Sequence, residues 1–430
     1  MKINLLFGRT GLSFSLPDDV KVTQIHKNPM IPLSNPSQAV TDALYRTTGC
    51  PPLVEIAKDK KKVCILICDI TRPVPNGILL PPLLKTLETA GISKEDVLIL
   101  VATGLHRPNE GEELREIIGC DETFNSVRIE NHFAMDRKAH AELGKTTRGI
   151  PIMIDRRFVD ADLKIVTGLI EPHFMAGYSG GRKVVAPGVA YKDTILNLHS
   201  ARILENCNAA NCIIDDNPLH DEQIEIIRKI GGILGLNVAI DENRQIAFVN
   251  FGEIERSHQE AVQFMRKYAE VSLPARFKTI VTTGAGYPLD RTYYQTIKGM
   301  VGVLEILEPG GTVIIASECS EGFGSSGFKQ AQRLLCEIGP DRFLSVIKRR
   351  KKAHIDEWQT EMLVKALRLG NIQLYATGLS QEDLKDIFVD PTASIKEAVL
   401  ASLRTHGDHE VAIVPEGPYV IPILGKGASA

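Results

Sequence analysis

Short runs of apolar residues recur along the chain, with helical segments between them. The runs at residues 62–68 (KVCILIC), 97–102 (VLILVA) and 164–170 (KIVTGLI) lack the strict alternation of a half-buried strand, which is typical of strands covered on both faces. Segments near residues 79–90 and 112–118 have the length and composition of helices. This order of strands and helices predicts βαβ units, and therefore an α/β fold with a mostly parallel sheet.

A second series of the same kind begins after a break near residue 270. We therefore expect two domains, residues 1–270 and residues 271–430, each with a mostly parallel sheet built from βαβ units. The other elements that the sequence predicts are a hairpin in residues 1–25, helices at 37–47, 218–229, 254–269 and from about 291, a helix starting at the capping box of residues 380–383, a hairpin formed by 236–240 and 245–250, and strands at 127–132, 150–159, 279–283, 312–317, 372–376 and 411–415.

Composition and charge are those of an ordinary globular protein. With 430 residues, 43% of them hydrophobic and 24% charged, the chain can bury two separate cores. A net charge of -3 gives no broad electrostatic case for a nucleic-acid or membrane partner, so the basic run KRRKK at residues 348–352 is assigned no function. The eight cysteines form no C-x-x-C pair, which argues against zinc and iron–sulfur sites. No apolar run could cross a bilayer and the first residues are too polar for a signal peptide, so we expect a cytoplasmic protein.

Polar side chains follow three of the predicted strands. Asp69 and Arg72 come after the strand at 62–68, His106 follows the next strand, and His173 lies just beyond the third. Ligands of open α/β sheets bind outside the carboxyl ends of the strands, so we expect these four side chains to converge. Each of them alone could be a helix cap or a loop contact, but four together indicate a site.

A glycine-rich turn with a lysine follows the third strand. Gly180 and Gly181 leave the backbone free to approach a ligand, while Ser179, Arg182 and Lys183 supply a hydroxyl and two cations. The turn therefore predicts an anion cradle beside a reactive amine.

The same turn has other interpretations. It fits G-x-S-x-G, the nucleophile elbow of hydrolases, although Ser179 comes well after the strand that ends at Ile170. The interpretation as a P-loop is weaker than that as a nucleophile elbow, because Arg182 interrupts the P-loop spacing and no Ser or Thr follows Lys183. A surface turn without a ligand is the third interpretation. A hydrolase that depends on Ser179 stays open as an alternative.

The run IEPHFMAGYSGGRK, followed by NLHS, resembles the nickel-dependent lactate racemase family, whose enzymes carry a nickel-pincer nucleotide. The resemblance implies that His173 is a catalytic acid or base and that Lys183 tethers the cofactor covalently. It also implies that His199 is the protein ligand to nickel and that Ser179 to Arg182 cradle the cofactor's phosphate.

Three further segments extend this resemblance. The segments DITRP and GLHRP match the family's pattern, in which Asp69 and Arg72 contact cofactor or substrate and His106 is the second catalytic histidine. Gln295 and Lys298 match its Q-x-x-K pair of substrate contacts. The resemblance thus spans both expected domains, and it implies an active site in the crevice between them.

The implied function is a racemase or epimerase that inverts C2 of a lactate-like 2-hydroxy acid. Two imidazoles, with an ordinary pKa of about 6.5, suit a reaction in which one group takes a proton while another gives one. An imidazole is too weak to remove the α-hydrogen as a proton, and the family's cofactor supplies the missing part by accepting hydride. Cofactor-assembly enzymes would be partners, and a homo-oligomer is possible. A non-catalytic cofactor-binding homologue is the other alternative, and the presence of both His106 and His173 argues against it.

Overall fold

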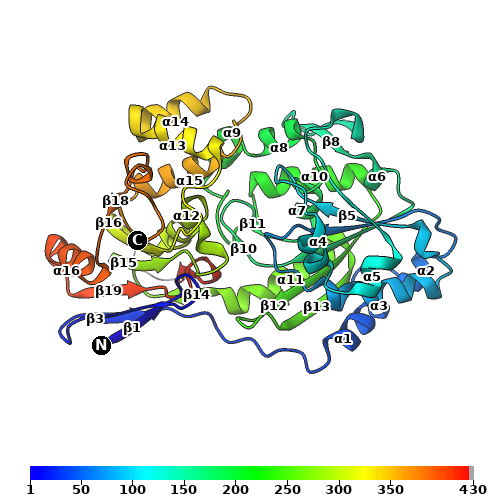
Figure 1. The fold of residues 1–430 in the computed structure, drawn as a ribbon, viewed down its shortest axis with the longest axis horizontal. Coiled ribbons are helices and arrows are strands. Elements are labelled where there is room, and N and C mark those ends of the chain that lie inside the picture. The colour runs from blue at the N-terminus through cyan, green and yellow to red at the C-terminus, as the bar shows by residue number, and fades with distance from the viewer. Residues whose placement is uncertain (426–430) are drawn as a thin grey trace. The chain divides into compact units, whose positions relative to one another are not determined.

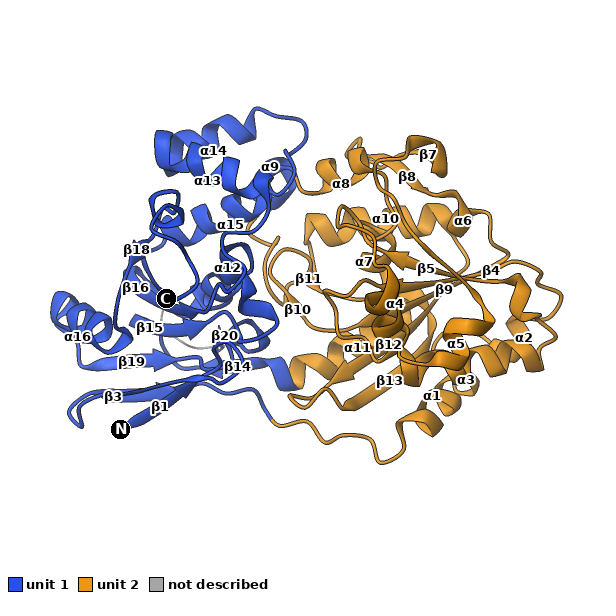
Figure 2. Cartoon of the chain, viewed as in Figure 1, with its two compact units in different colours: residues 1–28, 200–205, 268–430 blue, residues 29–199, 206–267 orange. Residues whose placement is uncertain are grey.

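The computed structural model describes residues 1–425, which form two compact units (Figures 1 and 2). Unit 1 comprises Met1–Asn28, Ser200–Glu205 and Tyr268–Ala430, and unit 2 comprises Pro29–His199 and Asn206–Lys267. Both units are α/β with mostly parallel sheets, as the sequence predicted. Among the described residues, no helix combines the length and the apolarity that crossing a membrane requires.

A six-stranded sheet of order β13-β12-β9-β4-β5-β6 organises unit 2. Neighbouring strands of this sheet are parallel, except for the antiparallel pair β12–β13. Every residue of β5 and all but the last of β4 are buried, which confirms the prediction of strands covered on both faces. The strands of this sheet are β4 (Val63–Cys68), β5 (Val97–Ala102), β6 (Arg128–Asn131), β9 (Leu163–Leu169), β12 (Ile233–Ile240) and β13 (Ile246–Glu253).

Helices and two small antiparallel pairs complete unit 2. Asn217 caps α10 by accepting hydrogen bonds from the backbone of Leu219 and His220 at 3.0 and 3.2 Å, with Pro218 in the first turn as expected. The helices are α1 (Pro36–Tyr45), α2 (Leu53–Ile56), α3 (Asn76–Thr89), α4 (Gly111–Ile118), α5 (Asp121–Ser126), α6 (Arg156–Val159), α7 (Arg182–Val185), α8 (Lys192–Leu198), α10 (Pro218–Ile230) and α11 (Ile254–Ala269), and the small pairs are β7 (His140–Lys145) with β8 (Pro151–Asp155) and β10 (Pro172–His173) with β11 (Gly177–Tyr178).

The sheet of unit 1 has the order β18-β17-β16-β15-β19-β3 and is parallel throughout. Its strands are β3 (Lys21–Gln24), β15 (Phe277–Thr283), β16 (Leu307–Ser317), β17 (Asn371–Ala376), β18 (Asp390–Pro391) and β19 (Glu410–Ile413). The remaining elements are the hairpin β1 (Lys2–Leu5) with β2 (Leu12–Ser15), the pair β14 (Glu270–Leu273) with β20 (Ile421–Leu424), and the helices α9 (Ala201–Leu204), α12 (Tyr293–Gly302), α13 (Ser326–Ile338), α14 (Pro340–Lys348), α15 (Glu357–Leu367) and α16 (Ile395–His406).

The first 28 residues belong to unit 1, whereas the expected division placed residues 1–270 together. The hairpin itself forms as predicted, but β3 then pairs with β19 in parallel, and Ile3 and Leu5 pack with Val281 and Ile314. A short strand carries no local signal for the sheet edge that it joins, because its partner lies almost 400 residues later.

Two predicted elements are shorter than expected. The strand at 150–159 ends at Asp155, whose side chain accepts a hydrogen bond from the backbone of Arg157 at 3.0 Å and so starts α6. Ser380 and Asp383 do form the reciprocal hydrogen bonds of a capping box, at 3.0 and 3.3 Å. Only a 3₁₀ turn follows them, because the chain next pairs with β17 as β18, and α16 begins later at its own cap, Ser394.

Candidate active site

The candidate residues of unit 2 gather at one edge of its sheet. Strands β9, β4 and β5 are adjacent and parallel, so their carboxyl ends meet at the same edge. Asp69 follows β4 directly, His106 lies in the turn after β5, and His173 belongs to β10, beyond the end of β9. This is the edge at which ligands bind in open α/β sheets.

A hydrogen bond joins His106 to Asp69. Nδ1 of His106 lies 2.6 Å from Oδ2 of Asp69, and Thr71 donates its hydroxyl to Oδ1 at 2.6 Å. Because a carboxylate only accepts, the proton of His106 is on Nδ1 and the lone pair of the neutral ring is on Nε2. The ring is 60% exposed and the Asp69 side chain 6% exposed, so a substrate can reach the imidazole but not the carboxylate that orients it. This is the arrangement of an oriented general base.

The pKa of Asp69 lies below its ordinary value. Burial alone would raise the pKa of this carboxyl, but hydrogen bonds from His106 and Thr71 and the charge of Arg72 outweigh burial. Asp69 is therefore ionised at neutral pH, and it can stabilise a positive charge that forms on His106 during proton transfer.

Backbone contacts hold the loop that carries His106. The His106 amide donates to the carbonyl of Thr103 at 2.9 Å, and Gly104 takes a φ of +55° that glycine adopts without strain. The Gly104 amide donates to the carbonyl of Gly188 at 2.9 Å. This last bond ties the His106 loop to the segment that follows Lys183.

Lys183 lies in the short helix α7, at the same edge of the sheet. Burial, followed by the positive charge of Arg72, lowers the pKa of its amine to about 7. Asp69 and Cys68 act on the same amine, which places it beside the end of β4. Much of the amine is therefore uncharged and nucleophilic at neutral pH, as covalent attachment of a ligand requires. Burial raises the pKa of Cys68 to about 12, so this thiol is inert.

His199 follows α8 and is held in one tautomer. Its Nδ1 donates to the carbonyl of Ile195 at 2.8 Å, so the lone pair of the ring is on Nε2. Burial lowers the pKa of His199 to about 4, and the nearby charge of Lys183 adds to this effect. A neutral imidazole with one nitrogen fixed by a backbone acceptor has the form in which histidine binds a metal.

His173 is buried and oriented in the opposite sense to His106. Its Nδ1 accepts hydrogen bonds from the backbone of Ala176 and Met175 at 3.1 and 3.3 Å, so the proton of the neutral ring is on Nε2. The tight turn between β10 and β11 makes this possible, because Gly177 takes a φ of +74° and leaves no room for a Cβ, which would lie 2.2 Å from the carbonyl oxygen of Ile213. In the neutral rings, Nε2 of His106 can therefore accept a hydrogen bond, whereas Nε2 of His173 can donate one.

The side chains of Ser179 and Arg182 bind the protein itself. The Ser179 hydroxyl donates to the carbonyl of Leu169 at 2.6 Å and accepts from the amide of Glu171 at 2.9 Å. The Arg182 guanidinium is buried, donates to the carbonyl of Ala176 at 2.7 Å and lies 2.7 Å from Nε2 of His258. The sequence predicts that the two side chains supply a hydroxyl and a cation to an anion cradle, and in the structure both of them bond within the protein. The Ser179 hydroxyl is directed to backbone groups and not to a histidine base, which weakens the hydrolase alternative.

The glycines of this turn pack directly on the sheet. Gly180 and Gly181 have φ of +73° and +47°, and a Cβ on Gly180 would lie 2.5 Å from a methyl carbon of Ile170. A Cβ on Gly168, within β9, would lie 2.9 Å from the Cα of Gly180. The close contact fixes the turn at the carboxyl end of β9.

Gln295 and Lys298 lie in unit 1, one turn apart on α12. Thr292 caps this helix, and its hydroxyl accepts from the Gln295 amide at 3.4 Å. The side-chain oxygen of Gln295 is buried without a hydrogen-bond partner among residues 1–425. A buried amide oxygen in this state gains free energy from a ligand that donates to it.

Some contributors to the site were not predicted from the sequence. Glu171 accepts from the Arg72 guanidinium at 3.4 Å, and Thr71 supports Asp69. Thr71 could have been found, since a hydroxyl two residues after an aspartate often bonds to it. Glu171 could not, because 99 residues separate it from Arg72 in sequence.

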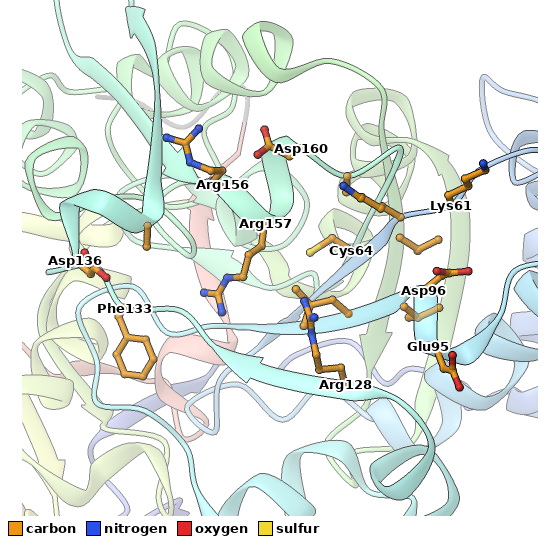
Figure 3. A pocket seen from close by; sticks show the side chains of 16 residues that line it. Lys61, Cys64, Glu95, Asp96, Arg128, Phe133, Asp136, Arg156, Arg157 and Asp160 are labelled. Atoms are coloured by element: carbon orange, nitrogen blue, oxygen red, sulfur yellow. The ribbon is translucent and has the colours of Figure 1, made fainter.

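A pocket of about 730 Å³ lies at the opposite, amino edge of the same sheet (Figure 3). It is lined by the starts of β4 and β5, and Figure 3 shows the guanidinium groups of Arg128 and Arg157 in it. Asp155 and Glu130 already pair with Arg157. None of the candidate residues lines this pocket, so its volume is no argument against the carboxyl edge.

The fold and this edge together define an α/β enzyme with a carboxylate-oriented histidine, a nucleophilic lysine and a neutral histidine suited to a metal. The model of the lactate racemase N-terminal domain matches residues 7–211, and that of the lactate racemase C-terminal domain matches residues 274–422. The chain belongs to the lactate racemase family and is an isomerase.

Relatives and solved structures agree with this assignment. The chain is 31% identical over 430 residues to a lactate racemase of Thermoanaerobacterium thermosaccharolyticum, covering 97% of this chain and 98% of that protein. It is 31% identical over 389 residues to a lactate racemase of Lactiplantibacillus plantarum, covering 89% and 90%. The apoprotein structure of the T. thermosaccharolyticum lactate racemase matches with a TM-score of 0.89 and 30% identity over 99% of this chain and 100% of that one. A Thermotoga maritima protein shares the fold, with a TM-score of 0.70 and 20% identity over 93% of this chain and 100% of that one.

Proposed function

We propose that this protein interconverts the enantiomers of lactate or of a closely related 2-hydroxy acid. The observation that carries the proposal is the pair of Asp69 and His106 at the same sheet edge as the weakly basic amine of Lys183. The pair supplies a base for the substrate hydroxyl, and the amine supplies an attachment point for a cofactor. Relatives over nearly the full length bear the name lactate racemase.

The two histidines would act on the substrate hydroxyl. His106 takes the hydroxyl proton on Nε2, and Asp69 stabilises the charge that results. His173, whose neutral ring presents Nε2–H, would donate a hydrogen bond to the substrate oxygen. Arg72 would hold the substrate carboxylate, and Gln295 and Lys298 are the further substrate contacts that the family resemblance implies.

The residues fit a nickel-pincer nucleotide. His199 is one imidazole ligand, and the described residues contain no group of three or more His, Cys, Asp or Glu that could hold a metal. One imidazole is not a metal signature by itself, so the nickel rests on the family resemblance, in which the metal comes with a nucleotide that is fixed to the protein elsewhere. Lys183 provides that fixation. When bound, this group supplies an acceptor for the C2 hydride, which no side chain at the edge can provide.

Other residues of the edge would hold the nucleotide part. The backbone N–H groups of Gly180, Gly181 and Arg182 would hold its phosphate, because a glycine-rich turn with positive φ can present successive amides to an anion. Ser179 and the Arg182 side chain would act indirectly by fixing the turn, and Asp69 would act through His106, to which it is hydrogen-bonded.

The covalent attachment is the first test. Protein made in cells that contain the cofactor-assembly enzymes should carry an adduct on the peptide with Lys183, and bound nickel in similar amount. Intact mass, peptide mapping and metal analysis measure this. Lys183→Arg, which keeps the charge but loses the nucleophile, should give unmodified protein, as should wild type made without the assembly enzymes. An active wild-type enzyme with neither nickel nor adduct would overturn the proposal.

The path of the C2 hydrogen is the second test. A proton taken from C2 by His106 or His173 would exchange with solvent, so racemisation in heavy water would place deuterium at C2. We expect almost none, because an imidazole is too weak a base for this carbon acid, and only the hydroxyl proton passes through the histidines. Mass spectrometry of lactate equilibrated in heavy water measures the label. Full C2 exchange per turnover would favour a two-base proton racemase instead.

A further inference from the structure

Residues Ser200–Glu205 belong to unit 1, although the chain on both sides of them belongs to unit 2. The segment begins directly after His199 and forms the single-turn helix α9. Its first residue is part of that turn, because the Ser200 carbonyl accepts from the amides of Ile203 and Leu204 at 2.9 and 3.0 Å. One rigid turn therefore connects His199 to Glu205.

Three cations hold the end of this turn. Oε2 of Glu205 accepts from Lys348 at 3.0 Å and from Arg368 at 3.2 Å, and Lys365 donates to the carbonyl of Leu204. Lys348 ends α14, Lys365 belongs to α15, and Arg368 follows α15. We name Glu205 with these three cations the α9 clasp. The cations also suit the negative end of α9, whose last carbonyls lack helical partners.

A buried acid, Glu361, lies close enough to the clasp to be influenced by the charge of Glu205. Glu361 of α15 is 1% exposed, and one carboxyl oxygen on each of Glu361 and Glu205 has no hydrogen-bond partner among the described residues. Burial and the charge of Glu205 raise the pKa of Glu361 to about 8, so Glu361 is mostly protonated at neutral pH. One turn before it, Glu357 pairs with Arg350.

Stabilisation alone does not explain such a cluster. The Lys348 and Arg368 side chains are about half exposed, and ion pairs of this kind contribute little to stability, whereas several charges on one carboxylate favour one arrangement of their elements. The clasp also accounts for part of the basic run at residues 348–352, since Lys348 pairs with Glu205 and Arg350 with Glu357.

We infer that the α9 clasp is a positioning device for His199, with Glu205 as its central residue. His199 lies between two helical turns. Its ring bonds to the carbonyl of Ile195 in α8, and the chain after it is fixed at Glu205 by α14 and α15. The clasp fixes the chain directly after His199, and so restricts the backbone that carries the imidazole. The inference rests on the proposed role of His199 as nickel ligand.

Glu205→Ala in the cofactor-loaded enzyme tests this inference. We expect nickel loss to a chelator to be at least tenfold faster than in wild type, while the mass of the Lys183 adduct is unchanged. Amide exchange of Leu204 and Glu205, which donate to Ser200 and Ala201, should also accelerate. Arg333→Gln is the matched control, because it removes an ion pair with Asp386 at 2.9 Å in the same unit and should behave as wild type.

The possible outcomes separate this inference from the proposed function. Nickel loss at the wild-type rate, with faster exchange in α9, would show that the clasp only stabilises α9 and would overturn the inference. An active wild type without nickel would instead refute the proposed function, and with it the role of His199 on which the inference rests. If Glu205→Ala fails to fold, Arg368→Gln keeps the Lys348 pair and should still speed nickel loss severalfold. A wild-type rate in that variant would equally overturn the inference.

Discussion

His106→Ala lowers kcat for racemisation by about 10³-fold or more and leaves the fold intact. A positioned general base contributes roughly 10²- to 10⁴-fold, and Asp69 orients this one through a 2.6 Å hydrogen bond. The ring is 60% exposed, so its removal leaves no cavity in the core and should change Tm little. Initial rates with both enantiomers, together with thermal unfolding, measure these effects.

Two variants sharpen this prediction. Asp69→Asn keeps the shape of the partner but removes the charge and the obligatory acceptor, so kcat should fall by a similar order while nickel and adduct stay bound. His409→Ala, at an exposed histidine of unit 1, is the control and should be fully active. If His106→Ala kept more than a tenth of wild-type kcat, His106 would be removed from the mechanism.

Continuous apolar runs made much of unit 2 predictable. The runs at β4, β5 and β9 are confirmed as buried parallel strands, and strand order then brings Asp69, His106 and His173 to one edge. To predict this edge, one only has to recognise each strand and the residues that follow it, because the carboxyl ends of all strands of a parallel sheet lie at the same edge.

Contacts between distant residues explain what the sequence did not predict. Arg182 would ordinarily be exposed, yet it is buried against His258, a residue 76 positions away in a helix with no motif of its own. The hydroxyl of Ser179 bonds to backbone groups at the end of β9. These bonds depend on how the turn folds back onto the strand, and the sequence does not show that. The inclusion of Ser200–Glu205 in unit 1 likewise depends on cations more than 140 residues later in the sequence.

Buried neutral histidines should make unit 2 labile to acid. His132, His220 and His258 are all buried, and burial lowers the pKa of His132 and of His220 to about 3 and that of His258 well below its ordinary value. Arg182 adds to the effect on His220 and His258. In the unfolded chain the same rings have a pKa of about 6.5. Their contribution to stability is therefore complete above about pH 6.5 and is lost as the pH falls toward the folded-state values.

The size of this effect follows from proton linkage. Between about pH 6 and 4, each such histidine lowers the free energy of unfolding by about 1.4 kcal/mol per pH unit, so these three together lower it by about 4 kcal/mol per unit. His199, with its pKa of about 4, adds to the slope in the same direction. Glu361 acts in the opposite direction, because its pKa of about 8 lies above the ordinary value and its contribution grows as the pH falls from 8 to 4.5. The net slope is then at least about 3 kcal/mol per unit, against a total stability of roughly 5–15 kcal/mol. The chain should unfold before pH 4.

Urea denaturation at pH 7.5, 6.0 and 5.0, followed by circular dichroism, measures this slope. His220→Leu should reduce the slope by about 1.4 kcal/mol per pH unit, because leucine fills similar space and takes up no proton. At pH 7.5 this substitution should lower the free energy of unfolding only slightly, since Nδ1 of His220 has no hydrogen-bond partner among residues 1–425. His409→Ala, at an exposed ring, should leave the slope as in wild type. A His220→Leu variant with the wild-type slope, or a wild type equally stable at pH 7.5 and 5.0, would mean that these rings are already protonated or exposed in the folded protein.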